Sequence, residues 1–180
     1  MGYNVKDVFY LDSTVATGTV ANDQVSSLDV SAYIDPIARG KSKAVGLAIY
    51  KVHWDLADAG ANGPIPAAST GTFRVGLAAG TGLPDGTVTV AAEQLNAGNA
   101  LMISGVDYWA GGTAAGDPPM YKWLEPSKDV PYIVVRDSLQ LITSADIAMS
   151  TDVNVYVRLE CAQITLDQAT LNQLLRTQTV

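Results

Sequence analysis

The chain has 180 residues, of which 48% are apolar and 16% charged, and its net charge is −7. This length and apolar share predict one domain with a sizeable core, and the acidic balance argues against nonspecific binding of nucleic acid by the surface as a whole. The low charged share indicates that partner subunits cover part of the exterior.

Cys161 is the single cysteine, so no disulfide can form within the chain. The first residues, MGYNVKDVFYLDS, have neither the basic nor the apolar region of a signal peptide. No apolar run approaches the roughly 20 residues that span a membrane. We therefore expect a protein that folds in a reducing cytosol and has no membrane span.

Short apolar or alternating segments, separated by turn residues, run through most of the chain. The segments predicted as strands are 5–11, 26–34, 43–56, 71–79, 86–92, 99–109, 130–136, 138–143 and 152–166. The stretches between them are rich in Gly, Pro, Asp and Asn, as turns require. Short strands at this spacing, with almost no helical period, predict an all-β sandwich of two sheets with about eight or nine strands.

Two of these strands change their apolar face along their length. In 43–56, apolar side chains leave one face at Ile49 and continue on the other from Tyr50. The last strand changes face in the same way between Cys161 and Ile164. Such a change of parity predicts a β-bulge or a bend from one sheet to the other. Long bent strands shared by two sheets are typical of jelly rolls.

Only the end of the sequence has a helical period. We predict a β-domain over residues 1–166 and a C-terminal helix or arm over 167–180, with Thr165 as the N-cap. Three leucines share one face of this segment and are candidates for a subunit interface: Leu171, Leu174 and Leu175. The alternative is that they dock the helix on its own sheet.

The triplet Gly40-Lys41-Ser42 matches the end of a phosphate-binding loop. That motif needs a glycine five positions earlier, where this chain has Asp35, followed by Pro36, which has no amide hydrogen to donate. The triplet also precedes a predicted strand instead of a helix. We therefore predict that it binds no nucleotide.

Three basic residues lie close together in this otherwise acidic chain: Arg39, Lys41 and Lys43. They are candidates for contact with an acidic partner, which could be genome phosphate, a lipid head group or a carboxylate cluster of a neighbouring subunit. The alternative is a solvated loop that leads into a strand. No aromatic residue lies among them, so a base-stacking surface is not indicated.

The sequence has no recognisable catalytic set. His53 is the only histidine, so a single chain cannot supply the usual zinc ligands, and no Gly-x-Ser-x-Gly motif occurs. Cys161 follows an alternating apolar run and is predicted to fill the core instead of pairing with His53 as a nucleophile. Asp55 and Asp58 lack the ligand spacing of a calcium loop. We predict no enzyme activity, no cofactor and no bound metal.

Aromatic residues flank a Gly- and Pro-rich loop, with Trp109 before it and Trp123 after it. Exposed aromatic rings at such positions could stack on sugars or fill a pocket between subunits. The alternative is ordinary packing beneath the loop.

Taken together, the strand pattern resembles that of the single jelly-roll capsid proteins of small icosahedral viruses. The resemblance implies eight strands in two four-stranded sheets, no active site, and assembly with copies of the same chain and with other capsid proteins. It also implies a component of the virion that is made in the host cytoplasm. Many such proteins carry a basic N-terminal arm for the genome, whereas Lys6 is the only basic residue before Arg39 here, which leaves contact with nucleic acid open.

Two other classes of protein share an all-β pattern. A carbohydrate-binding sandwich would use the aromatic residues between 108 and 123, although such modules are usually secreted. A small hydrolase on a β-scaffold would need a pair of carboxylates, and none of the three glutamates, Glu93, Glu125 and Glu160, lies in a recognisable setting.

Overall fold

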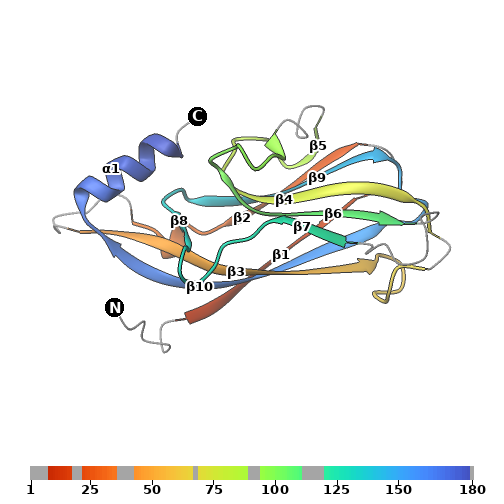
Figure 1. Cartoon of the computed structure of the whole chain (residues 1–180), viewed down its shortest axis with the longest axis horizontal. Coiled ribbons are helices and arrows are strands. Elements are labelled where there is room, and N and C mark those ends of the chain that lie inside the picture. Colours follow the sequence, from red (N-terminus) through yellow and green to blue (C-terminus); the bar gives the residue numbers. More distant parts are fainter. Residues whose placement is uncertain are drawn as a thin grey trace.

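The computed structural model describes residues 8–17, 22–35, 43–66, 69–88, 94–110 and 120–178, apart from the side chains of Ala110 and Asp146. Within these ranges the chain forms two antiparallel sheets that pack face to face, and a short helix at the C-terminal end (Figure 1). The predicted all-β sandwich is confirmed.

One sheet has four strands and the other has six. The four-stranded sheet has the order β1-β10-β3-β8 and contains β1 (Val8–Ala16), β3 (Ala44–Asp58), β8 (Tyr132–Val134) and β10 (Val153–Leu166). The six-stranded sheet has the order β5-β2-β9-β4-β6-β7 and contains β2 (Asp23–Asp29), β4 (Gly71–Ala79), β5 (Gly86–Val88), β6 (Met102–Ala110), β7 (Met120–Leu124) and β9 (Ser138–Ile147). The sequence analysis missed β7, and it ended the first strand at Leu11, whereas β1 continues to Ala16.

The strand order is that of a jelly roll. Without the two edge strands β5 and β7, the six-stranded sheet reads β2-β9-β4-β6 and faces β1-β10-β3-β8. Numbered along the chain, these eight strands lie in the orders 2-7-4-5 and 1-8-3-6. First and last strands are therefore neighbours, and the chain crosses between the sheets after almost every strand, as in a double Greek key.

Aliphatic side chains fill the space between the sheets. Leu47 and Leu159 project from the four-stranded sheet, and Leu77 and Leu141 from the six-stranded sheet, and each of them is at most 1% exposed. The strands alternate because one face of each must be buried: in β10, Val153, Val155 and Val157 are buried while the residues between them are not. The interior is thus a packed core.

The predicted change of face in the strand 43–56 is confirmed as a β-bulge. Lys51 lies opposite Glu160, but the next pair is Ile49 with Cys161, so Tyr50 has no residue opposite it. The extra residue keeps Ile49 and Val52 on the same core although they are three positions apart. The change predicted for the last strand between Cys161 and Ile164 is wrong, because the register is regular from Cys161 to Leu166 and the one register shift, between Glu160 and Cys161, comes from the extra residue in β3.

The helix α1 spans Gln168–Thr177, and its N-cap is Asp167 instead of the predicted Thr165. The carboxylate Oδ1 of Asp167 accepts a hydrogen bond from the backbone N–H of Thr170 at 2.7 Å. Thr165 lies within β10, where its backbone pairs with β3 opposite Val45. The N-cap prediction was wrong because Thr165 still belongs to the strand, which ends at Leu166, so the helix begins only after that residue.

The helix packs on the end of the sandwich. Leu171 is only 2% exposed and lies in a small cluster with Ala44, Val135 and Leu166, while Leu174 and Leu175 are partly buried against the same cluster. The packing of the helix on the protein's own sheet therefore explains the burial of Leu171.

The residue after the helix also binds the β8 segment. The side-chain amide of Gln178 accepts a hydrogen bond from the backbone N–H of Val135 at 3.2 Å and donates one to the carbonyl of Ile133 at 2.5 Å. The amide thus occupies the position that a neighbouring strand would take at this edge.

Candidate functional site

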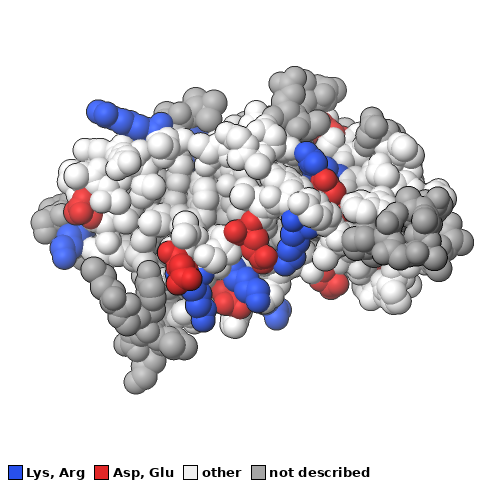
Figure 2. All heavy atoms as spheres, in the orientation of Figure 1, with Lys and Arg blue, Asp and Glu red and all other residues white. Residues whose placement is uncertain are grey.

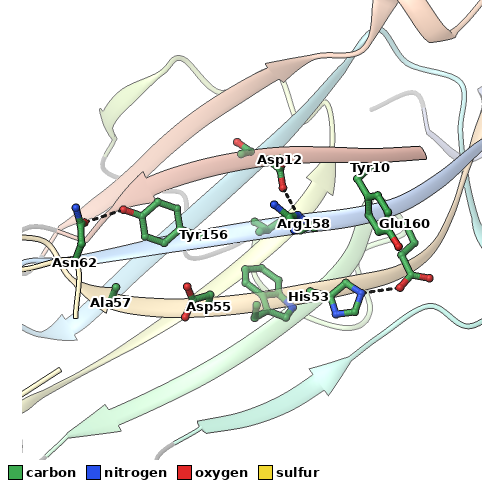
Figure 3. A pocket seen from close by; sticks show the side chains of 12 residues that line it. Tyr10, Asp12, His53, Asp55, Ala57, Asn62, Tyr156, Arg158 and Glu160 are labelled. Atoms are coloured by element: carbon green, nitrogen blue, oxygen red, sulfur yellow. Dashed lines mark hydrogen bonds and ion pairs between the residues drawn. The ribbon is translucent and has the colours of Figure 1, made fainter. Parts of the chain in front are cut away.

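A groove of about 860 Å³ lies on the outer face of the four-stranded sheet (Figure 3). Strands β1, β3 and β10 supply most of its lining. Its polar and aromatic lining residues are Tyr10, Asp12, Ser13, His53, Trp54, Asp55, Asn62, Tyr156, Arg158 and Glu160.

The period of two along each strand places these side chains together. In β10, Val157 and Leu159 point into the core, so Tyr156, Arg158 and Glu160 point outward. The register then sets their neighbours: Arg158 lies between Asp12 of β1 and His53 of β3. The outer face therefore carries ordered rows of side chains that run across the strands.

Arg158 and Asp12 form the first charged pair of the groove. The guanidinium Nε lies 2.7 Å from the carboxylate Oδ1, and the guanidinium carbon lies 6.0 Å from the ring centroid of Tyr10. The hydrogen bond to Asp12, followed by the charge of that carboxylate, raises the pKa of Arg158. Both side chains are about 60% exposed, so the pair orders the surface more than it stabilises the fold.

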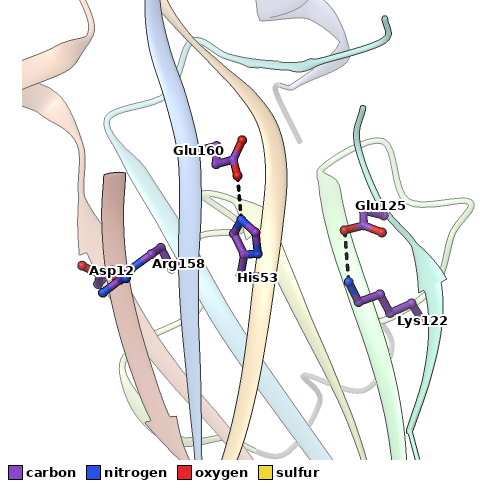
Figure 4. Close-up of polar contacts among 6 residues, drawn as sticks. All are labelled: Asp12, His53, Lys122, Glu125, Arg158 and Glu160. Atoms are coloured by element: carbon purple, nitrogen blue, oxygen red, sulfur yellow. Dashed lines mark hydrogen bonds and ion pairs between the residues drawn. The ribbon is translucent and has the colours of Figure 1, made fainter. Parts of the chain in front are cut away.

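His53 and Glu160 form the second pair, with the imidazole Nε2 2.7 Å from the carboxylate Oε1 (Figure 4). Glu160 lies directly opposite Lys51 in the register, so it is bordered by two basic side chains. At the other end of the groove, the hydroxyl of Tyr156 hydrogen-bonds the Oδ1 of Asn62 at 3.2 Å. Figure 2 shows the same interleaving of acidic and basic side chains across the visible face.

The structure does not bring His53 together with Cys161. The imidazole is on the outer face, whereas the thiol is fully buried in the core between the sheets. Burial, with a smaller contribution from the charge of Glu160, raises the pKa of Cys161 to about 12. The thiol therefore stays protonated, and the prediction that Cys161 fills the core is confirmed.

Asp58 stabilises a turn. Its carboxylate accepts hydrogen bonds from the N–H groups of Gly60 (3.0 Å) and Ala61 (2.9 Å) and from the hydroxyl of Thr151 (2.7 Å). The bond from Thr151 and those from the turn lower the pKa of Asp58. Within the described part of the chain, no group of three or more His, Cys, Asp or Glu residues could hold a metal ion.

The predicted basic cluster is only partly visible. Arg39 and Lys41 lie outside the described residues, as does the whole Gly40-Lys41-Ser42 triplet, whereas Lys43 is exposed directly before β3. Contact of these residues with an acidic partner stays a prediction.

Trp123 and Trp109 lie on the outer face of the six-stranded sheet. The indole of Trp123 covers Gly105, and the guanidinium of Arg74 lies 5.2 Å from the centroid of its ring. Arg74 also forms a bidentate ion pair with Asp107, at 2.6 and 2.7 Å. Trp109 lines a smaller cavity of about 320 Å³ beside this ion pair. The structure therefore places both rings near Arg74, and a role for them in an interface stays a prediction.

The sequence analysis did not single out Tyr10, Asp12, Tyr156 or Arg158 as groove residues. The signal that could have found three of the lining residues is the run of polar side chains at every second position of β10. Their partners on β1 lie almost a whole chain length away, so only the register reveals them.

Solved structures with a similar arrangement of strands are jelly-roll capsid proteins. VP1 of Trichodysplasia spinulosa-associated polyomavirus, in complex with sialylated glycooligomers, matches with a TM-score of 0.49 and 8% identity, over 93% of this chain and 98% of that chain. VP1 of Merkel cell polyomavirus, in complex with disialyllactose, matches with a TM-score of 0.41 and 7% identity, over 91% and 98%. The turnip yellow mosaic virus structure matches with a TM-score of 0.32 and 14% identity, over 90% and 98%.

No family model matches the sequence, and no characterised protein matches it significantly. The jelly-roll assignment therefore rests on the strand order of the protein itself. Among the described residues, no helix has the length and apolar character to cross a membrane.

Proposed function

We propose that the protein is a structural subunit of a viral capsid, which assembles with copies of itself into a closed shell. The observation that carries this proposal is the double Greek key order of the two sheets, an architecture common to capsid proteins and a few other classes. The core between the sheets is filled by aliphatic side chains such as Leu77 and Leu159. A sandwich with a packed core is rigid enough to serve as a subunit of a shell.

The surface supports the same proposal. Only 16% of all residues are charged, and in the groove Asp12 forms an ion pair with Arg158 while Glu160 hydrogen-bonds His53. Copies of such a chain can approach closely with little charge to desolvate. In this proposal the protein is part of the virion, is made in the host cytoplasm, and can have other capsid proteins as further partners.

The candidate contact residues lie in different places on the surface and would make different kinds of contact in this proposal. Leu174 and Leu175 retain exposed surface beside the helix and can contact a neighbouring subunit. Trp109 and Trp123 offer partly exposed aromatic rings on the opposite sheet, and Lys43 offers a positive charge to an acidic partner. In this proposal, both these side chains and the edges of the sheets form contacts between subunits.

The test is the size of the purified protein in solution. Size-exclusion chromatography with light scattering should find a closed particle of many 18.9 kDa subunits, and negative-stain microscopy should show particles of uniform diameter. A protein that stays monomeric across salt concentration, pH and protein concentration would overturn the proposal.

A second candidate is a carbohydrate-binding module, which the groove on the four-stranded sheet favours. Tyr10 and Tyr156 offer aromatic faces, while Asp55, His53 and Arg158 offer donors and acceptors for sugar hydroxyls. The site differs from the aromatic residues between 108 and 123 that the sequence suggested.

A glycan array followed by calorimetry tests this candidate. Tyr10→Ala should abolish binding, whereas Tyr121→Ala should leave it unchanged. The two tyrosines are equally exposed, at 59% and 57%, but only Tyr10 lines the groove. Equal losses in the two variants, or no binding by the unchanged protein, would dismiss the candidate.

A further inference from the structure

One edge of the four-stranded sheet has a long unpaired side. Strand β1 pairs with β10 over nine residues, Val8 to Ala16, without a register shift. It is the last strand in the sheet order, and no described backbone group forms a hydrogen bond to its outer side. Such a row of unpaired N–H and C=O groups is a template for another strand.

The other three edges are protected. Within the described residues, strands β5 and β8 have three residues each, and Gln178 occupies the outer side of the β8 segment. Strand β7 has five residues, carries Lys122, and has a register shift against β6 at Gly105 and Val106. Short length, lysine and bulges are the devices by which proteins prevent pairing between edges.

Strand β1 has none of these devices. Its sequence, VFYLDSTVA, contains no lysine, arginine, proline or glycine. Its one charged side chain, Asp12, is neutralised by Arg158 of the same sheet. Two of its apolar or aromatic side chains are exposed, Val8 at 36% and Tyr10 at 59%.

We propose that β1 pairs antiparallel with β1 of a second copy of this chain, so that the two four-stranded sheets become one continuous sheet. The contact is related by a two-fold axis and consumes the open edge of both partners, so it gives a closed dimer and not a growing fibre. This inference rests on the proposed shell function, because it names one of the contacts that would build the shell.

The distribution of charge favours a second copy of this chain as the partner of β1. The chain has a net charge of −7, so two copies carry charge of the same sign, but the only carboxylate on β1 is already ion-paired. A pairing centred on Asp12 would place two carboxylates opposite each other and is disfavoured. Pairing centred on Leu11 or on Ser13 instead places Asp12 opposite the hydroxyl of Tyr10 or of Thr14 in the other copy. Both registers are complementary to themselves.

Hydrogen exchange of the wild-type protein tests the pairing directly. In the monomer, only those β1 amides that face β10 should be protected, so protection should alternate along residues 8–16. Above the dimerisation concentration, found by sedimentation, the alternation should vanish over the residues that pair with the other copy, which are 8–14 in the register centred on Leu11 and 10–16 in the register centred on Ser13. The exchange of each backbone amide is measured separately after the reaction is quenched. An oligomer in which the alternation persists, or a protein without any oligomer, overturns the inference.

A matched pair of variants supplies a second test. Thr14→Asp adds a carboxylate to the exposed edge strand, whereas Thr165→Asp makes the same change at an exposed position of β10 that pairs with β3 and lies beyond Ala162, where the described pairing with β1 ends. Thr14→Asp should weaken the dimer about tenfold, because the two-fold axis duplicates the added charge, while Thr165→Asp should not. Equal dissociation constants for the two variants would overturn the inference, and if Thr14→Asp fails to fold, the exchange experiment decides alone.

The two proposals fail in different ways. Uniform particles in which β1 protection still alternates would overturn the edge pairing and leave the shell function standing. A dimer with continuous β1 protection that never forms a larger particle would support the pairing and overturn the shell function.

Discussion

The indole of Trp123 lies so close to Gly105 that a β-carbon on the glycine would come within 2.0 Å of the ring. Glycine at this position lets the β7 tryptophan lie flat on β6, beneath the guanidinium of Arg74. The contact explains why a glycine lies in the middle of β6.

Gly105→Ala should therefore destabilise the protein by about 1–3 kcal/mol, since the methyl group must displace the tryptophan or the strand. Urea unfolding monitored by circular dichroism measures the change. Gly63→Ala is the control, because its nearest neighbour to an added β-carbon is 4.0 Å away. Equal stability of the two variants would mean that Trp123 does not rest on Gly105 in solution.

Leu171→Ala should cost about 2–5 kcal/mol, because it leaves a cavity between α1 and the end of the sandwich. Gln173→Ala, on the exposed side of the same helix, should change the free energy of unfolding by less than about 0.5 kcal/mol. Thermal and urea denaturation compare the two. If Leu171→Ala is as harmless as Gln173→Ala, the helix is detached in solution and is available as an arm for a neighbouring subunit.

Thr143→Val should stabilise the protein by roughly 1 kcal/mol. The hydroxyl of Thr143 is buried and has no hydrogen-bond partner among the described residues, and valine replaces it with a methyl group of similar size. Thr143→Ala removes the same hydroxyl but leaves a cavity, so it should destabilise. A loss of stability in the valine variant would reveal a partner of the hydroxyl, such as a buried water.

Asp58→Asn should make stability less dependent on pH in the acid range. The pKa of Asp58 is lowered from 3.8 by hydrogen bonds to its ionised form, so its contribution to stability is present above pH 3.8 and is lost as the pH falls through the lower folded-state value. The wild type should be the more stable protein at pH 7, and the difference should shrink below about pH 3.8. Urea titrations at both ends of this range measure it. A difference that stays constant with pH would assign the effect to the shape of the turn instead of its charge.

The fold was predictable where one strand carries its own signal. The shift of apolar residues from Ile49 to Val52 predicted the bulge, since only an extra residue keeps both side chains in one core. The N-cap was misplaced because Thr165 and Asp167 are both capping residues, and only the β3 pairing of Thr165 excludes it. Strand β7 was missed because five residues beside a Gly- and Pro-rich loop carry too short an alternation.

The groove was less predictable because it is assembled from distant segments. The ion pair between Asp12 and Arg158 joins residues 146 positions apart, and nothing local to either residue indicates the other. The contrast among the four sheet edges depends in the same way on tertiary structure, since it appears only when the strand order is known.

The neighbouring positions of β1 and β10 also have a consequence for biosynthesis. Among the described strands β1 comes first, and its one backbone partner is β10, in which Arg158 lies opposite Asp12 although the two residues are 146 positions apart. While the ribosome is still adding the intervening residues, β1 has no partner in its own chain, and folding must wait for one of the most distant pairings that the sequence contains. The strand best suited to bind a second copy is thus the one that remains unpaired longest during synthesis. Neighbouring chains on one polysome could therefore exchange first strands, and slower translation of the last segment should increase the yield of such swapped pairs.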